Sequence, residues 1–189
     1  MPLYTLDELR QEFRKGRKLK YLFFWGHQPA ADGSLTKSCF SQWWKCNFTV
    51  DGERYSSAEQ YMMAEKARLF RDEEIVEQIM MSRHPKQAKD LGRKVRGFDP
   101  DVWAEKGYDI VVRGNMAKFS QNPDLEQYLL GTRQRVLVEA SPVDSIWGIG
   151  LAADDERIEN PLLWKGTNLL GFALMQVRDQ LKMNESDIV

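Results

Sequence analysis

Several features that mark large classes of protein are missing from this chain. Two cysteines in 189 residues are too few for a disulfide framework or for a zinc site of their own. No apolar run reaches the ~18 residues that span a membrane, and the N-terminal segment is amphipathic rather than a secretory signal. The 27 Lys and Arg residues nearly balance the 28 Asp and Glu residues, which argues against a general nucleic-acid binder. These absences predict a cytoplasmic protein that uses no membrane.

The familiar catalytic and cofactor motifs are also absent. The chain has no P-loop, no glycine fingerprint for dinucleotides, no HExxH and no GxSxG. Cys39 and Cys46 lack the spacing of a metal motif, and His27 and His84 lie far apart in turn-like sequence. We therefore expect no metal site and no resident cofactor.

Aromatic residues are what the chain does have. They make up 11% of the sequence, and many stand beside turn residues rather than in periodic core patterns. Core packing is the ordinary explanation of such residues, but aromatic loops also line concave sites for flat ligands.

Hydrophobic periodicity and capping signals predict a mainly helical α+β protein. Thr5 to Glu8 and Ser57 to Gln60 read as capping boxes, and Asp51-Gly52 is a two-residue hairpin signal. The predicted helices cover residues 6–16, 58–70, 72–81, 86–94, 101–119, 123–130 and 168–181. Asp72 is the expected cap of the 72–81 helix, and Gly107 and Gly114 are points where the 101–119 helix could bend. The predicted strands cover residues 21–25, 46–50, 53–55 and 135–139, and the predicted loops cover 27–39 and 141–156, with a frayed tail at 183–189. Without a repeat or linker, residues 1–189 are expected to form one domain with a small antiparallel sheet.

Glu59 and Lys66 are the first candidates for a functional site. Glu59 lies in the first turn of its predicted helix, and Lys66 follows two helical turns later on the same face. A solvated helix surface is the ordinary interpretation of such a pair. Residues 61–64 leave little polar surface between them, however, which favours a partly buried face. Burial and the positive end of a helix act in opposite directions on a carboxylate, and this is one way to tune an acid or base.

Two glycine-bearing segments are further candidates. Asp144 stands three residues before Trp147 in the sequence DSIWGIG, whose glycines allow close backbone approach to a ligand, unless the segment is simply an Asx-turn with a packed Trp. The segment around Asn168 is glycine-rich and could present helix N–H groups to a phosphate, or Asn168 serves only as a helix cap. Arg93 and Arg96 are possible anion partners, with solvated surface charge as the favoured alternative.

In their order along the chain, these segments resemble the YbiA-like, or NADAR, family. The resemblance covers residues 20–181 and rests on the following stretches: FFWGH (23–27), FSQWW (40–44), YSSAEQYMMAEKA (55–67), PKQAKDLGRKVRGF (85–98), NMAKFSQN (115–122), LVEASPVDSIWGIG (137–150) and WKGTNLLGFALMQVR (164–178). One order over nearly the whole chain is far more specific than any single motif.

The resemblance implies a mainly helical YbiA-like fold and an N-glycosidase. The implied reaction hydrolyses phosphoribosylamino-pyrimidine intermediates of riboflavin biosynthesis and releases ribose 5-phosphate. Carried over by position, the family's acidic residues fall on Glu59 and Asp144, and its tryptophans on Trp103 and Trp147. The pocket positions Lys66, Arg93 and Asn168 and the stacking candidates Trp43 and Trp44 complete the implied site.

Cleavage of an N-glycosidic bond places positive charge on the ribose in an oxocarbenium-like transition state. One carboxylate stabilises that charge and another group activates water, but the sequence does not divide these roles between Glu59 and Asp144. Two positions depart from the family pattern: Gln42 stands where Asn is usual, and Gln60 where His is common. Both departures bear on the choice of substrate more than on the fold.

Three other functions remain open besides the N-glycosidase. An ADP-ribosyl-guanine glycohydrolase would need room for a diphosphate and adenosine and would bring nucleic acid in as a partner. A non-catalytic module binding NAD or ADP-ribose derivatives would bind without turnover. A purely structural role would leave the aromatic loops unexplained.

Overall fold

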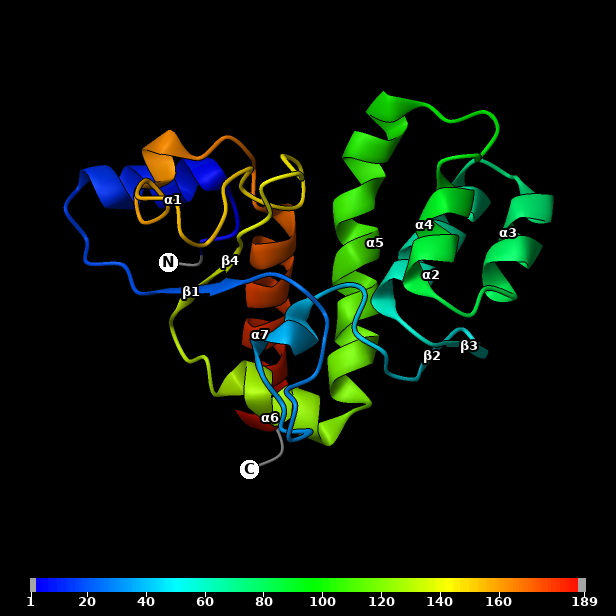
Figure 1. Ribbon diagram of the computed structural model, residues 1–189, viewed down its shortest axis with the longest axis horizontal. Coiled ribbons are helices and arrows are strands. Elements are labelled where there is room, and N and C mark those ends of the chain that lie inside the picture. The colour runs from blue at the N-terminus through cyan, green and yellow to red at the C-terminus, as the bar shows by residue number, and fades with distance from the viewer. Residues whose placement is uncertain (1–2, 187–189) are drawn as a thin grey trace. The chain divides into compact units, whose positions relative to one another are not determined.

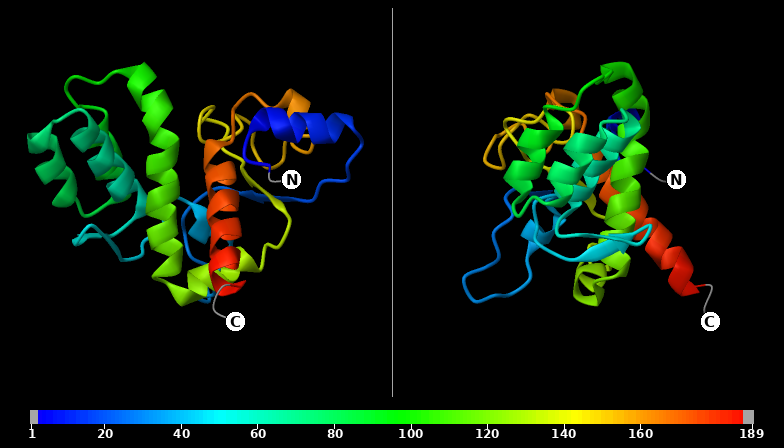
Figure 2. Two further views of the ribbon diagram at one scale, coloured as in Figure 1. Left: turned by 180° about the vertical axis from the view of Figure 1, so that it is seen from behind. Right: turned by 90° about the vertical axis from the view of Figure 1, so that its right-hand side faces the viewer.

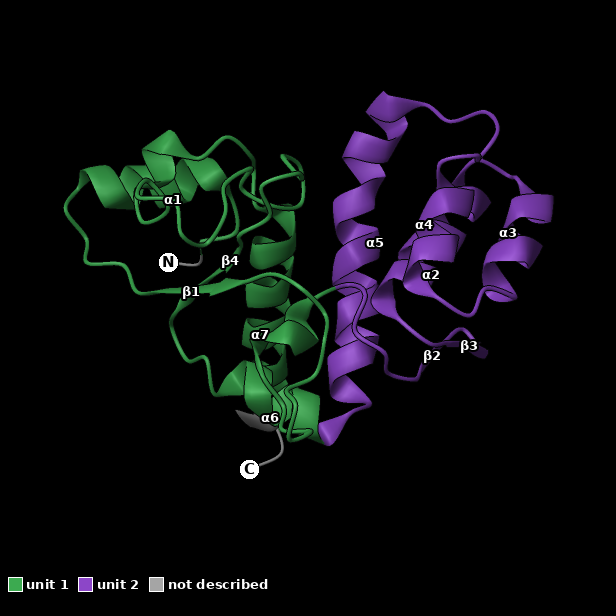
Figure 3. Cartoon of the chain, viewed as in Figure 1, with its two compact units in different colours: residues 1–41, 124–189 green, residues 42–123 purple. Residues whose placement is uncertain are grey.

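The computed structural model describes residues 3–186, which form two compact units. Unit 1 comprises the chain up to residue 41 and from residue 124 onward, and unit 2 comprises residues 42–123 (Figure 3). The described residues are mainly helical, with one antiparallel hairpin, so the predicted α+β class is confirmed. That residues 1–189 form a single domain stays a prediction.

Unit 2 is built on four helices, three of which pack around the central α2. Helix α2 (Ala58–Leu69) contacts α3 (Glu73–Met80), α4 (Pro85–Gly92) and the long α5 (Pro100–Ser120), as Figure 1 shows. Residues 58–64 of α2 are all buried, because neighbours cover the helix on several sides. Glycines permit this close packing: a Cβ at Gly114 of α5 would lie 2.3 Å from the ring of Tyr61.

A hairpin precedes α2 in unit 2. Strands β2 (Phe48–Val50) and β3 (Glu53–Tyr55) pair antiparallel, with Phe48 opposite Tyr55. Asp51 and Gly52 both have positive φ, 52° and 83°, as the predicted two-residue turn requires. The rings of Phe48 and Tyr55 lie 5.8 Å apart and both contact Tyr61 of α2, which anchors the hairpin to the helices.

Unit 1 is organised around two parallel strands. Strand β1 (Tyr21–Phe24) pairs in register with β4 (Val136–Glu139), and β4 packs against helix α7 (Leu169–Ser186). Three consecutive β4 residues, 136–138, are buried, as in strands covered on both faces. The sequence predicted both strands but not their parallel pairing.

Shorter elements complete unit 1. They are α1 (Leu6–Arg14), the 3₁₀ helix η1 (Lys37–Phe40), α6 (Pro123–Leu130) and the 3₁₀ helix η2 (Pro161–Leu163). The chain between β1 and η1 makes a long excursion, drawn in blue at the lower left of the right-hand view in Figure 2. Within residues 3–186, no helix combines the length and apolar character needed to cross a membrane.

The structure corrects several local predictions. The predicted loop 27–39 ends in η1, where the Thr36 side chain caps the turn. Helix α4 ends at Gly92 rather than residue 94, and α5 runs uninterrupted past its two glycines. Helix α7 continues to Ser186, so residues 183–186 of the predicted frayed tail are helical, and residues 187–189 lie outside the described part.

Two of the predicted caps at helix starts work differently from expectation. Ser57 accepts a hydrogen bond from the Gln60 N–H, but the Gln60 side chain accepts from Ser56 rather than from Ser57, so the reciprocal box is not formed. Asp72 precedes α3 without a side-chain capping bond. Its carboxylate instead accepts hydrogen bonds from the guanidinium and backbone N–H of Arg96, which together lower the pKa of Asp72 to about 2.

Candidate functional site

The predicted site residues fall into two groups, one in each unit. Unit 2 carries Glu59, Lys66 and Trp103 together with Trp43, Trp44 and Arg93. Unit 1 carries Asp144, Trp147 and Asn168.

Glu59 is a buried carboxylate on α2. Its side chain is in the first turn of the helix and the residue is only 6% exposed, although glutamate is rarely buried in proteins. Its backbone N–H donates to the carbonyl of Gln42, 2.9 Å away, so the start of the helix is tied to the segment before the hairpin. The predicted partly buried face of α2 is confirmed.

Lys66 lies within electrostatic range of Glu59 and is half-buried. Its Nζ donates to the carbonyl of Gly92 at 2.9 Å and lies 4.2 Å from the ring centroid of Phe98 and 5.8 Å from that of Trp103. Burial lowers the pKa of the Lys66 ammonium, while the Glu59 carboxylate raises it. Together, α2, α4 and α5 place a carboxylate, an ammonium and two aromatic rings in one neighbourhood.

Phe98 is the member of this cluster that sequence reasoning did not single out. It lies in the turn before α5 and its ring packs edge-on against Phe70, with centroids 5.3 Å apart. No fixed spacing relates Phe98 to Lys66, because the two come from different elements. The only signal was an aromatic residue beside a glycine in the RGF sequence.

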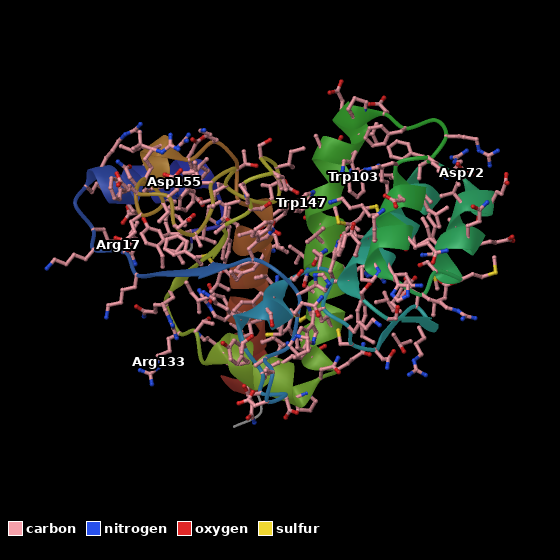
Figure 4. The ribbon with its side chains drawn as sticks, in the orientation of Figure 1. Arg17, Asp72, Trp103, Arg133, Trp147 and Asp155 are labelled. Atoms are coloured by element: carbon pink, nitrogen blue, oxygen red, sulfur yellow. The ribbon has the colours of Figure 1, made fainter. Side chains whose placement is uncertain are left out.

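The other predicted residues of unit 2 are less enclosed. Trp103 is partly exposed on the first turn of α5, where it is labelled in Figure 4. Trp43 and Trp44 are both half-buried, and the centroid of the Trp43 ring lies 5.8 Å from Lys89 Nζ. The Arg93 side chain is 70% exposed and 3.6 Å from Asp90, which matches the surface-charge interpretation.

In unit 1, Asp144 organises the loop that holds Trp147. Its Oδ1 accepts hydrogen bonds from the N–H groups of Ile146 at 2.9 Å, Trp147 at 2.8 Å and Gly148 at 3.4 Å. This is the Asx-turn that the sequence offered as the ordinary interpretation. Since Oδ1 is used in this way, any contact of the carboxylate with a substrate falls to Oδ2. Trp147 is half-buried, and Figure 4 labels it.

The glycines around the start of α7 approach other backbone segments, not an open ligand site. A Cβ at Gly166 would lie 2.3 Å from the carbonyl oxygen of Gly148, and one at Gly171 would lie 2.1 Å from that of Leu137. The N–H groups of Leu169 and Leu170 at the start of α7 donate to carbonyls of residues 146 and 147. The predicted phosphate-binding helix start therefore has these two donors occupied within the fold.

Asn168 connects α7 to strand β4. It is fully buried with φ 56°, its Oδ1 accepts from the Glu139 N–H at 3.0 Å, and its Nδ2 donates to the Leu137 carbonyl at 3.0 Å. Asparagine tolerates this left-handed conformation better than most residues. The side chain thus bridges to the strand and does not cap the helix.

The two departures from the family pattern also have structural roles. Gln42 is buried, and its Oε1 accepts from Asn115 of α5 at 2.9 Å. Gln60 accepts from the N–H and hydroxyl of Ser56, and its amide nitrogen donates to the carbonyls of residues 79, 80 and 82 at the end of α3. Both amides therefore bind their own unit rather than point to an acid–base role.

Comparison with known proteins points to one family. The NADAR domain matches residues 23–182. N-glycosidase R617 of Acanthamoeba polyphaga mimivirus is 46% identical over 166 residues, covering 85% of this chain and 96% of that protein. The maize protein named Riboflavin biosynthesis protein PYRR, chloroplastic, is 36% identical over 57% of this chain but only 16% of its own length.

The same comparison extends to a solved structure. N-glycosidase YbiA of Escherichia coli is 31% identical to this protein, and the match covers 72% of this chain and 76% of the length of YbiA. The NMR structure of E. coli YbiA superimposes with a TM-score of 0.71 at 27% identity and covers 89% of each chain. The predicted YbiA-like fold is confirmed.

Proposed function

Because this chain belongs to the NADAR family, we propose that it hydrolyses the N-glycosidic bond of a phosphoribosylamino-pyrimidine intermediate of riboflavin biosynthesis. Its relatives named N-glycosidase identify it as a hydrolase of N-glycosyl compounds. The pyrimidine substrate is the finer part of the proposal, and the relative named as a riboflavin biosynthesis protein supports it. Ribose 5-phosphate and the free aminopyrimidine are the expected products.

The observation that carries the proposal is the buried Glu59 carboxylate within electrostatic range of Lys66, whose ammonium lies over the Phe98 and Trp103 rings. Rupture of the C1–N bond leaves positive charge on the sugar, and a buried carboxylate stabilises such charge more strongly than an exposed one does. Aromatic faces stack on a planar base at roughly 1–3 kcal/mol per base. The cluster thus offers a group for the charged sugar and a surface for the pyrimidine.

The proposed chemistry balances with water as the only co-reactant. The bonding electrons leave with the pyrimidine amine, which takes up a proton. Water adds to C1 of the ribose and gives one proton to a carboxylate, which returns to its ionised form by passing a proton to the released amine. We assign Glu59 to the sugar charge and to the water, and Lys66 to the anionic part of the substrate.

Asp144 is the second carboxylate of the proposal. Its Oδ1 is bonded to backbone N–H groups of its own loop, so its proposed contact with substrate is through Oδ2. The same bonds hold Trp147 in place, and we propose that this ring stacks on the base. Asp144 therefore combines a chemical role with a positioning role.

The experiment is chromatography of the products formed from the phosphoribosylamino-pyrimidine by wild type, Glu59→Gln and Glu77→Gln. Glu77 is an exposed carboxylate on α3 and serves as the matched control. Wild type and Glu77→Gln should release ribose 5-phosphate, and Glu59→Gln should be slower by roughly 10²- to 10⁴-fold. Equal rates for both variants would overturn the assignment of Glu59.

A parallel incubation separates the competing functions. Hydrolysis of ADP-ribosylated guanosine but not of the pyrimidine would replace the substrate with that of an ADP-ribosyl-guanine glycohydrolase. Tight binding of NAD or ADP-ribose without turnover of either substrate would indicate a binding module.

A further inference from the structure

Unit 1 contains a cavity of about 1090 Å³ that the proposed function does not use. Three segments supply all of its lining except Leu3: the chain just before β1, the turn between α6 and the start of β4, and helix α7. Seven of its fifteen lining residues are Lys or Arg and one is acidic, although the whole chain has a net charge of −1. Such clustering creates a strong local positive potential in a nearly neutral protein.

The segment before β1 supplies three of the cations. Arg17, Lys18 and Lys20 are all exposed. Arg17 lies 3.3 Å from Glu12, a pair exposed enough for its charges to be screened by solvent. Figure 4 shows Arg17 and Arg133 at the edge of unit 1 where β1 begins, one on each side of the strand.

Helix α7 supplies a rigid, buried cation. Arg178 is 3% exposed, and its Nη1 donates to the Thr132 hydroxyl at 3.0 Å and to the Arg135 carbonyl at 2.8 Å. Its neighbour Asp179 accepts from Arg178 Nε at 3.3 Å and also from the hydroxyl of Tyr4 at 3.0 Å. The Thr132 hydroxyl and the Arg135 carbonyl are neutral and orient Arg178, while Asp179, the one acidic lining residue, offsets part of its charge.

The turn before β4 holds a further arginine in a costly conformation. Arg133 has φ 57°, in the left-handed region where glycine is the favoured residue. Its carbonyl accepts from Lys182 Nζ at 3.1 Å, which links the turn to α7, and its side chain lines the cavity. Backbone strain that persists at a cavity wall is typical of functional sites.

We propose that this cavity binds a polyphosphate, an anion with two or more adjacent phosphate groups. Cations converging from three segments on one volume match a ligand whose negative charges are close together. None of the fifteen lining residues is aromatic, so the cavity offers no platform for stacked bases, which single-stranded nucleic-acid sites usually combine with basic grooves. No residue assigned a role in the proposed hydrolysis lines it.

The test is calorimetric titration of the full chain with inorganic tripolyphosphate at low and high salt. The double variant Lys18→Gln/Lys20→Gln removes two exposed cavity cations, and Arg54→Gln/Arg83→Gln removes two exposed cations of unit 2 as the matched control. We expect about tenfold weaker binding for the cavity variant, no change for the control, and weaker binding of all proteins at high salt.

A second variant removes charge without adding strain. Arg133→Gly deletes a cavity cation and suits the left-handed backbone, so it should weaken tripolyphosphate binding several-fold without lowering the melting temperature. ATP should bind about as well as tripolyphosphate, and adenosine should not compete.

Four results would overturn the proposal. They are no binding to wild type, equal weakening by the cavity and control doubles, competition by adenosine, and tighter binding of a single-stranded oligonucleotide than of tripolyphosphate. Because the readout is binding of an anion that contains no glycosidic bond, these outcomes are independent of whether the hydrolase proposal holds.

Discussion

Helix α2 in unit 2 and the 144–150 loop in unit 1 hold their candidate residues in different ways. On α2, the helical repeat places Glu59 and Lys66 on one face, and neighbouring helices then bury that face. In the loop, Asp144 and Trp147 are held by hydrogen bonds to backbone groups and by a second backbone segment that packs within atomic contact of the glycines.

The glycines of the two units also differ in which atoms they allow to approach. The helical glycines of unit 2 admit a side chain: a Cβ at Gly92 would lie 2.1 Å from Met63 Sδ. Gly148, Gly166 and Gly171 of unit 1 admit backbone atoms, and a Cβ at Gly148 would lie 2.9 Å from the Asp144 carbonyl oxygen. A side chain can move aside and a backbone cannot, so the loop of unit 1 should tolerate change less well than α2.

Among changes to the 144–150 loop, Asp144→Asn should alter the rate most, and it separates charge from loop geometry. An asparagine oxygen accepts the same N–H bonds, so the loop should stay folded, while the loss of charge should slow hydrolysis by roughly 10²- to 10³-fold. Asp144→Ala should in addition lower the free energy of unfolding by about 1–2 kcal/mol. Full turnover by Asp144→Asn would mean that Asp144 only holds the loop.

Gly171→Ala tests the backbone contact directly. The new Cβ would lie 2.1 Å from the Leu137 carbonyl oxygen, so we expect unfolding to become easier by about 3 kcal/mol in urea titrations. Gly16→Ala is the control, since Gly16 has φ 77° with open space around it and should cost only about 1–2 kcal/mol from conformation alone. If both variants lost the same free energy of unfolding, the contact with the Leu137 carbonyl would not be the cause of the Gly171→Ala effect.

Asn168→Ala should cost about 2 kcal/mol of stability. It leaves the Glu139 N–H and the Leu137 carbonyl without the side-chain bonds that they make at 3.0 Å. Asn168→Asp keeps the acceptor for Glu139 but loses the donor to Leu137, so its melting temperature should show whether the donor matters. A fully stable Asn168→Ala with impaired substrate binding would instead restore Asn168 to the binding site.

The smallest expected effect is the pH dependence that Lys66 contributes to stability. Burial lowers the pKa of Lys66 in the folded state, so between that value and the ordinary 10.5 the unfolded chain binds more protons. The free energy of unfolding should therefore rise with pH as the folded protein loses this proton first. Urea midpoints between pH 7 and 10 should rise less in Lys66→Met than in Lys86→Met, an exposed control on α4. Identical slopes would show that Lys66 is not desolvated.

Periodic segments could be predicted from the sequence closely. The hairpin at Asp51-Gly52 and helix α6 follow from local turn and capping chemistry, as does the adjacency of Glu59 and Lys66 on α2. Local signals failed where a distant partner competed for the same group. The Gln60 amide, for example, binds the end of α3, and the Asp72 carboxylate binds Arg96.

Local sequence patterns specify the set of elements and the residues that carry chemistry, because helix periodicity, turn geometry and residue type act over a few neighbours. Packing between elements, in contrast, pairs β1 with β4, brings Phe98 to Lys66 and gathers cations from three separate segments around one cavity. These relations join residues that are distant in sequence, and packing between elements, not any local pattern, brings them together.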